Sequence, residues 1–143
     1  DYPISYFLRP ARVVEIADPR LVTVAELAEV ELEPEEAILF KTENSRQGFV
    51  SCGQFREDFV ALAAEAAQWC VDRAVPLVGH DYITVDPYRS PEAPAHRLLL
   101  GHGIPLLEGI NLRNVAPGSY TLVCLPLKMV GAEGAPARAV LLR

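Results

Sequence analysis

The amino-acid sequence predicts one α/β domain that spans residues 1–143. Short apolar runs rich in β-branched residues alternate along the chain with stretches in which apolar residues recur every three or four positions. Strands and helices that alternate in this way are typical of a sheet with helices packed against it. No internal repeat, low-complexity tract or linker interrupts the sequence, and 143 residues are enough to bury one hydrophobic core.

Five segments have the composition of β-strands. The apolar run that opens residues 37–42 indicates a strand covered on both faces. Another short apolar segment lies at residues 104–107, and the Pro117-Gly118 pair predicts a turn before the next strand. The predicted strands are residues 12–17, 37–42, 76–79, 120–125 and 137–142.

Three segments have helical patterns. Thr23 and Glu26 have the spacing of a capping box, which predicts a short helix over residues 24–30. Apolar residues at three- and four-residue spacing predict a longer helix over residues 58–73. A third, short helix is predicted over residues 95–101, and the polar residues 44–54 are predicted to form a loop.

The net charge of −6 and the scattered basic residues argue against a surface for nucleic acid or for anionic membranes. No apolar run reaches the roughly 20 residues of a membrane-spanning helix. Cys52, Cys70 and Cys124 are odd in number and form no C-x-x-C pair. This pattern suits reduced thiols, so we expect a cytoplasmic protein.

Residues 79–109 contain the best candidates for a functional site. His96 lies in the first turn of the predicted helix 95–101, and Glu108 follows the apolar segment 104–107. If these twelve residues fold back on themselves, the two side chains can meet at one cation, and imidazole and carboxylate both suit Zn²⁺ or Mn²⁺. Spacing alone leaves a second interpretation open, a surface histidine and a helix-capping glutamate.

The surrounding motifs add a resemblance to a known family. The blocks Ala95-His-Arg97, Gly103-Ile104, Leu107-Glu-Gly109, Leu122 to Lys128 and Gly134 to Ala139 resemble the C-terminal signature of the metal-dependent cyclase family, which includes kynurenine formamidase and isatin hydrolase. Gly79-x-Asp81-Tyr82, Val85-Asp86 and Lys41-Thr-x-Asn-Ser45 also match family positions, and the likeness extends more weakly to residues 6–13.

The resemblance implies a fold and a site. The fold is a mixed α/β sheet in the swivelling β/β/α arrangement of the cyclase type, with the N-terminal part of that fold absent from this sequence. His96 and Glu108 match two metal ligands of the family. The other ligands and the general base come from a His-x-Gly-Thr-His-x-Asp segment. No histidine precedes residue 80, so we expect that segment upstream of Asp1.

The resemblance also implies a reaction, the hydrolysis of C–N bonds in amides or formamides such as N-formylkynurenine, in tryptophan catabolism. A metal-activated water would attack the carbonyl and a general base would take the proton. Because half of the ligand set is missing, we expect the chain to be inactive alone. Two other functions stay open: a non-catalytic relative acting as a binding module, and a subunit whose metal site a partner chain completes.

Three further residues are weaker candidates. Asp81 is a candidate for orienting a ligand histidine, as is Asp86, although capping or turn roles suit both residues better. His102 is a candidate for lining the pocket, but its six-residue offset from His96 places the two on different sides of a helix. The missing N-terminal part would leave apolar surface uncovered, so we expect a homodimer or homotetramer.

Overall fold

A computed structural model describes residues 2–143. Its centre is a mixed sheet of six strands in the order β6-β5-β3-β1-β7-β8. The strands β6, β5, β3 and β1 run parallel to one another, whereas β7 pairs antiparallel with β1, and β8 pairs antiparallel with β7. The strand bounds are β1 Leu8–Glu15, β3 Ala37–Lys41, β5 Val78–His80, β6 Leu106–Glu108, β7 Gly118–Val123 and β8 Val140–Leu142.

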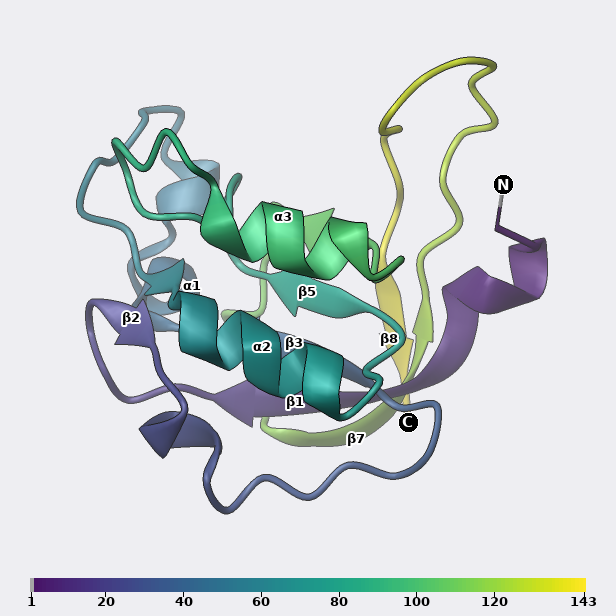
Figure 1. Cartoon of the computed structure of the whole chain (residues 1–143), viewed down its shortest axis with the longest axis horizontal. Coiled ribbons are helices and arrows are strands. Elements are labelled where there is room, and N and C mark those ends of the chain that lie inside the picture. Colours follow the sequence, from purple (N-terminus) through teal and green to yellow (C-terminus); the bar gives the residue numbers. More distant parts are fainter. Residues whose placement is uncertain (1) are drawn as a thin grey trace.

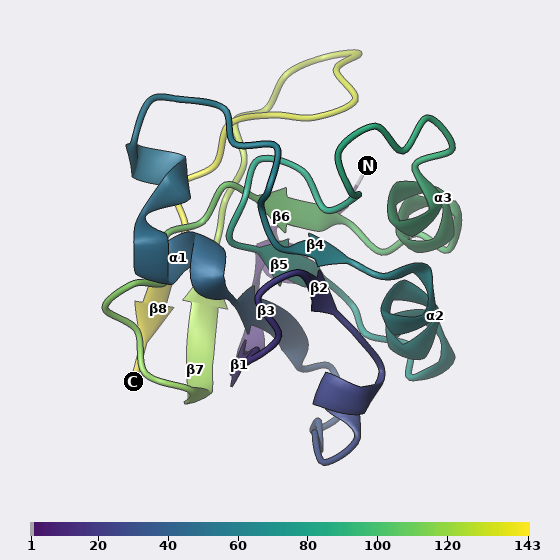
Figure 2. The ribbon, with the colours of Figure 1, turned by 90° about the vertical axis from the view of Figure 1, so that its left-hand side faces the viewer.

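Two helices cover one face of this sheet, α2 (Ala64–Asp72) and α3 (Pro94–Gly101), and they pack side by side (Figure 1). Figure 2 shows both helices end-on, on the same side of β3 and β5. A second, two-stranded parallel sheet joins β2 to β4. The remaining elements are η1 Ile4–Phe7, β2 Leu21–Val22, η2 Ala25–Leu27, α1 Glu43–Gln47, η3 Phe49–Ser51 and β4 Ala61–Leu62.

The centre of the main sheet is buried on both faces. All five residues of β3 are buried, as its apolar composition predicted. Ile38 and Phe40 pack into the core beneath α2 and α3, while Leu39 packs into a second core on the opposite face. Residues from β1, β7 and the segment after β6 fill that second core, so the sheet curls around it.

The connection between β7 and β8 forms an extended arm, residues 124–139, that projects from the body (Figure 1). One bridge, between Pro126 and Ala137, and the hydrogen bond from Leu127 N to Pro136 O hold its base together. Its apolar side chains are largely exposed: Leu127 by 63% and Val130 by 99%. The arm therefore presents apolar surface away from both cores.

Three predictions of local structure were wrong in detail. The capping box at Thr23 does not form, because the Glu26 carboxylate accepts hydrogen bonds from the backbone of Ala17 and Asp18 instead. Only the 3₁₀ turn η2 remains of the helix predicted over residues 24–30.

The helix predicted over residues 58–73 begins at Ala64, because the residues before it pair with β2 as strand β4. The loop predicted over residues 44–54 contains helix α1, whose first turn is capped by the Thr42 hydroxyl. Gly48 ends α1 with a φ of 72°, in the left-handed region that glycine tolerates. The five predicted strands and the helix at residues 94–101 are present, but β1 begins at Leu8 instead of residue 12, and β8 at Val140 instead of residue 137. The short strand β2 was not predicted. Among residues 2–143, no helix has the length and hydropathy to cross a bilayer.

Candidate active site

The site lies where β5, β6 and the start of α3 meet. Parallel pairing of β5 with β6 aligns His80 with Glu108, the last residue of β6. The Glu108 carboxylate accepts a hydrogen bond from Val85 N (2.9 Å), in the segment that connects β5 to α3. This contact fixes one oxygen of Glu108 at the edge of the sheet, close to the first turn of α3.

Asp86 ties His96 to the start of α3. Its carboxylate oxygens accept hydrogen bonds from the backbone N–H groups of Ala95 (2.8 Å) and His96 (3.1 Å), two of the unpaired donors in a first helical turn. The same carboxylate lies 2.6 Å from His96 Nδ1, so Nδ1 carries the proton and donates it. Nε2, on the opposite side of the ring, therefore points away from Asp86.

His96 and Glu108 face each other across the edge of the sheet. Nε2 of His96 lies 3.4 Å from Oε1 of Glu108, and both side chains are largely covered. Two electron-rich atoms at this separation favour a proton or a cation between them. Two ligands of a tetrahedral Zn²⁺, each about 2.1 Å from the ion, would lie roughly 3.4 Å apart. The pair therefore fits one edge of a metal site, and Asp86 has the orienting position typical of such sites.

Burial raises the pKa of the Glu108 carboxyl above its ordinary value, with the nearby Asp86 carboxylate adding to the rise. His96 and the Val85 N–H act in the opposite direction, but they do not offset the loss of solvent. The site thus keeps a carboxylate in an environment that disfavours its charge unless a cation lies beside it.

An open pocket of about 570 Å³ leads to His96. Three of its lining residues are aromatic: Phe55, Phe59 and Tyr88. Phe55 and Tyr88 are 52% and 41% exposed, although their ring centroids lie only 5.5 Å apart. Phe55, Phe59 and Tyr88 form an aromatic wall of the pocket. The sequence did not predict this wall, because its residues come from two loops with no periodic pattern.

Tyr82 supports the pocket from beneath. Its ring stacks on Phe59 with a centroid separation of 4.3 Å. Its hydroxyl accepts a hydrogen bond from Arg56 N (2.7 Å) and donates one to Arg56 O (2.9 Å). A buried phenol therefore holds the loop that carries Phe55.

The other candidates from the sequence lie elsewhere. Asp81 is fully buried, and its carboxylate accepts hydrogen bonds from the residues that begin α1: Thr42, Asn44 and Ser45. Its contacts are those of a helix cap and not of a residue that orients His96. His102 is exposed, its Nδ1 donates to Leu98 O (2.7 Å), and it does not line the pocket.

His80 is fully buried, and its Nε2 donates to Val60 O (2.9 Å). Burial lowers the pKa of its imidazole, so the ring is neutral. Across residues 2–143, no three His, Cys, Asp or Glu side chains converge as a metal cluster.

Comparison with known proteins identifies the family. The family model described as "Cyclase" matches residues 1–87, more than half of the chain. The chain belongs to the cyclase family. Kynurenine formamidase from Salinibacter ruber is 39% identical to this cyclase-family chain over 142 residues, which are 99% of the chain and 66% of that relative. The chain therefore spans slightly less than two thirds of that relative's length.

Solved structures confirm the predicted cyclase-type fold. A structure described as "potential metal-dependent hydrolase with cyclase activity" superimposes with a TM-score of 0.86 at 30% identity, over 97% of this chain and 67% of that one. An isatin hydrolase bound to the product analogue thioisatinate gives a TM-score of 0.79 at 22% identity, over 97% of this chain and 61% of its own. The second match supports the fold alone.

The raised pKa of Glu108 predicts a pH-dependent effect of Glu108→Gln on stability. Because the folded pKa lies above the unfolded value, the contribution of Glu108 is fully present below the unfolded pKa and is lost as the pH rises through the folded pKa. Glutamine keeps an acceptor for Val85 N–H without the charge. We expect the melting temperature of the variant to be about 2 °C above that of the native chain near pH 8. Near pH 4 we expect the two melting temperatures to be equal.

Differential scanning calorimetry with a chelator present measures this difference. Glu29→Gln is the matched control, because Glu29 is exposed and lies far from the site in sequence. A Glu108→Gln variant that melts below the native chain at pH 8 would contradict the unfavourable burial of the carboxylate.

Proposed function

We propose that this chain is part of a metal-dependent hydrolase of C–N bonds in amides or formamides. His96 and Glu108 supply two ligands of its divalent cation, Zn²⁺ or Mn²⁺. The observation that carries the proposal is the 3.4 Å separation of His96 Nε2 and Glu108 Oε1, with Asp86 bonded to the opposite nitrogen of the ring. The printed names of the relatives, kynurenine formamidase and metal-dependent hydrolase, support the same reaction class.

The roles of the side chains follow from their contacts. A bound cation would polarise the amide carbonyl and acidify a coordinated water. Asp86 keeps the proton of His96 on Nδ1, so that Nε2 remains a donor of electrons to the ion. The Val85 N–H holds Glu108 Oε1 toward Nε2. The remaining ligands and the general base are proposed to come from a His-x-Gly-Thr-His-x-Asp segment or from a partner chain.

The pocket favours an aromatic substrate. Phe55 and Tyr88 present exposed rings beside His96, and an aryl group gains most from stacking on such surfaces. An aryl formamide such as N-formylkynurenine combines this ring with a C–N bond for hydrolysis. We propose this substrate class on the strength of the pocket together with the name of the relatives.

Metal binding is the first test. We expect Mn²⁺ or Zn²⁺ to bind weakly to the chain, because two protein ligands form an incomplete site. His96→Ala should abolish this binding, and Asp86→Asn should weaken it roughly tenfold, because the orientation of the ring is lost. Isothermal titration and elemental analysis of undialysed protein measure both effects.

His102→Ala is the matched control for this measurement. It removes an imidazole at the other end of α3, which lies outside the pocket. Equal loss of metal in the His102 and His96 variants would indicate surface binding. Unchanged binding in the His96 variant would exclude the proposed site.

Turnover of N-formylkynurenine tests the reaction. The chain alone, with added Zn²⁺ or Mn²⁺, should be inactive. A supplied polypeptide that carries His-x-Gly-Thr-His-x-Asp should restore hydrolysis, and His96→Ala should remove it again. Formate release and absorbance of the product give two readouts. Hydrolysis by the unsupplemented chain would contradict the incomplete site, and hydrolysis by the supplemented His96 variant would contradict the role of His96.

We also propose a cytoplasmic location. Cys52, Cys70 and Cys124 are all free thiols in the structure. Burial raises the pKa of Cys70 to about 12, which keeps this thiol protonated and inert. Unpaired thiols of this kind suit a reducing compartment.

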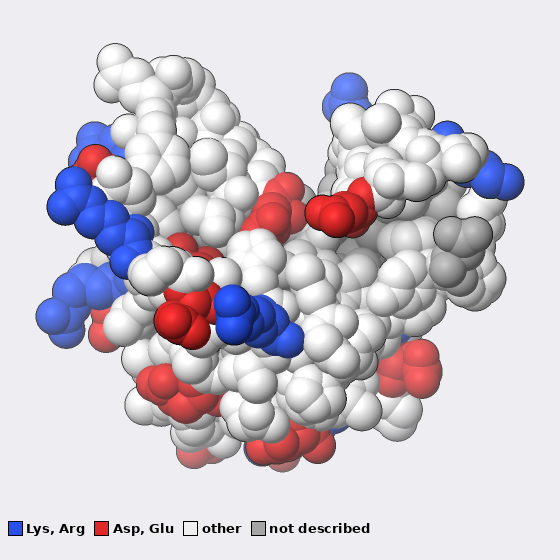
Figure 3. Space-filling view, turned by 45° about the horizontal axis from the view of Figure 1, so that its top comes forward, with Lys and Arg blue, Asp and Glu red and all other residues white. Residues whose placement is uncertain are grey.

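We further propose that two copies of the chain associate through the arm and β8. The strand β8 forms an edge of the main sheet, and Val140 and Leu142 on it are 44% and 51% exposed. Exposed apolar residues on an unpaired edge favour pairing with a second, identical strand. Figure 3 shows a face hollowed between two lobes, one of them on the side of the N-terminus where the arm lies.

Changing the arm should therefore shift the oligomeric state. We expect light scattering at micromolar concentration to give a dimer or larger species for the native chain. A double variant with Leu127→Asp and Val130→Asp should shift it toward the monomer, because the charges oppose burial of the arm. Leu100→Asp, at an exposed position of α3, is the control. A monomeric native chain would exclude this assembly.

A further inference from the structure

We infer that Arg89 binds an anionic group of the ligand, so that the pocket selects aromatic compounds that carry a carboxylate. This inference rests on the proposed function, since the pocket is taken as the substrate site. It adds a specificity residue, Arg89, which would bind the carboxylate that N-formylkynurenine also carries. The observations that support it concern the position, the partners and the backbone of Arg89.

Arg89 is the one arginine or lysine among the described residues that line the pocket. Its guanidinium carbon lies 5.2 Å from the centroid of the Tyr88 ring. Tyr88 in turn lies against Phe55, so the cation sits at the end of the aromatic wall. A planar ligand that stacks on these rings would bring a substituent within reach of the guanidinium.

The donors of Arg89 are available for a ligand. Within residues 2–143 its guanidinium makes no hydrogen bond and no ion pair, whereas Arg97, on α3, contacts Glu92 at 3.9 Å. Asp86, the one carboxylate among the described residues that line the pocket, already accepts from Ala95 and His96. A guanidinium over an aromatic ring keeps its N–H edges free, and these edges match the two oxygens of a carboxylate.

The backbone holds Arg89 in an unusual conformation. Its φ of 60° lies in the left-handed region, which non-glycine residues adopt at a cost in free energy. The turn that closes from Ser90 N to Pro87 O fixes this conformation. The turn thus fixes the backbone of Arg89, whose exposed side chain lies beside the Tyr88 ring.

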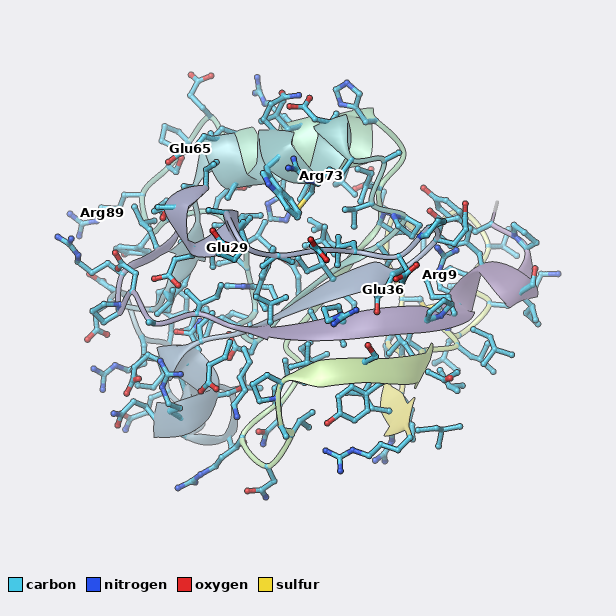
Figure 4. The ribbon with its side chains drawn as sticks, turned by 90° about the horizontal axis from the view of Figure 1, so that it is seen from below. Arg9, Glu29, Glu36, Glu65, Arg73 and Arg89 are labelled. Carbon is cyan, nitrogen blue, oxygen red and sulfur yellow. The ribbon has the colours of Figure 1, made fainter. Side chains whose placement is uncertain are left out.

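Figure 4 places Arg89 at one end of the molecule, well apart from Arg73. Arg73 also lies over an aromatic ring, that of Trp69, at 4.0 Å, but it does not line the pocket beside His96. The two residues share a cation–π contact and differ in access to the site. Arg73 is therefore the matched control for Arg89.

Binding of small probes to the full chain tests the inference without any catalysis. The probes are 2-aminobenzoate, its neutral analogue 2-aminobenzamide, and acetate, each titrated by NMR in the presence of a chelator. We expect 2-aminobenzoate to bind more tightly than either of the others. Arg89→Gln should weaken 2-aminobenzoate roughly fivefold and leave 2-aminobenzamide unchanged, because only the charge-assisted contact is lost.

Two further variants sharpen the result. Arg89→Lys should retain part of the preference, because it keeps the charge but not the two-pronged donor. Arg73→Gln should change nothing. Equal weakening of both aromatic probes by Arg89→Gln would mean a role in loop structure and would overturn the inference.

A native chain that binds the benzoate no better than the benzamide would overturn it as well, as would acetate binding of equal strength. Metal binding at His96 and Glu108 is measured separately. Failure here with intact metal binding would therefore leave the hydrolase proposal standing.

Discussion

The Asp86 carboxylate is the contact on which the candidate site depends. It accepts from two backbone donors at the start of α3 and from the ring of His96. One buried group thus begins the helix, fixes the direction of the imidazole and selects its tautomer. Without it, the first turn of α3 would lose its cap and His96 would be free to turn away from Glu108.

The sheet supplies the other half of the site. Glu108 stands at the end of β6, where parallel pairing with β5 fixes its position along the strand. The segment that leaves β5 returns past it, and Val85 N binds its carboxylate on the way to α3. Carboxyl ends of parallel strands commonly hold binding groups for this reason, since loops from neighbouring strands converge there.

Much of this arrangement could be predicted from local sequence. The helix at residues 94–101 and the short apolar strand after it bring His96 and Glu108 together, and both elements have clear patterns. From the sequence, the contact between Asp86 and His96 was only one of several possibilities. The two residues are ten positions apart, and no local pattern indicates that they touch. The segment before α2 was predicted to be helical, because its apolar spacing fits a helix as well as a strand. Its pairing with β2 makes it strand β4, and this pairing has no signal in the local sequence.

The hydroxyl of Tyr82 holds one loop of the pocket in place before a ligand binds. By binding both the N–H and the C=O of Arg56, it removes much of the freedom that an exposed loop would otherwise keep. If the loop that carries Phe55 became ordered only when a ligand binds, the loss of conformational entropy would weaken binding. Here the loop is already ordered in the folded protein. A planar ligand would thus bind to a preorganised aromatic wall. The pocket would discriminate among ligands by their shape and charge, because the protein does not need to change conformation.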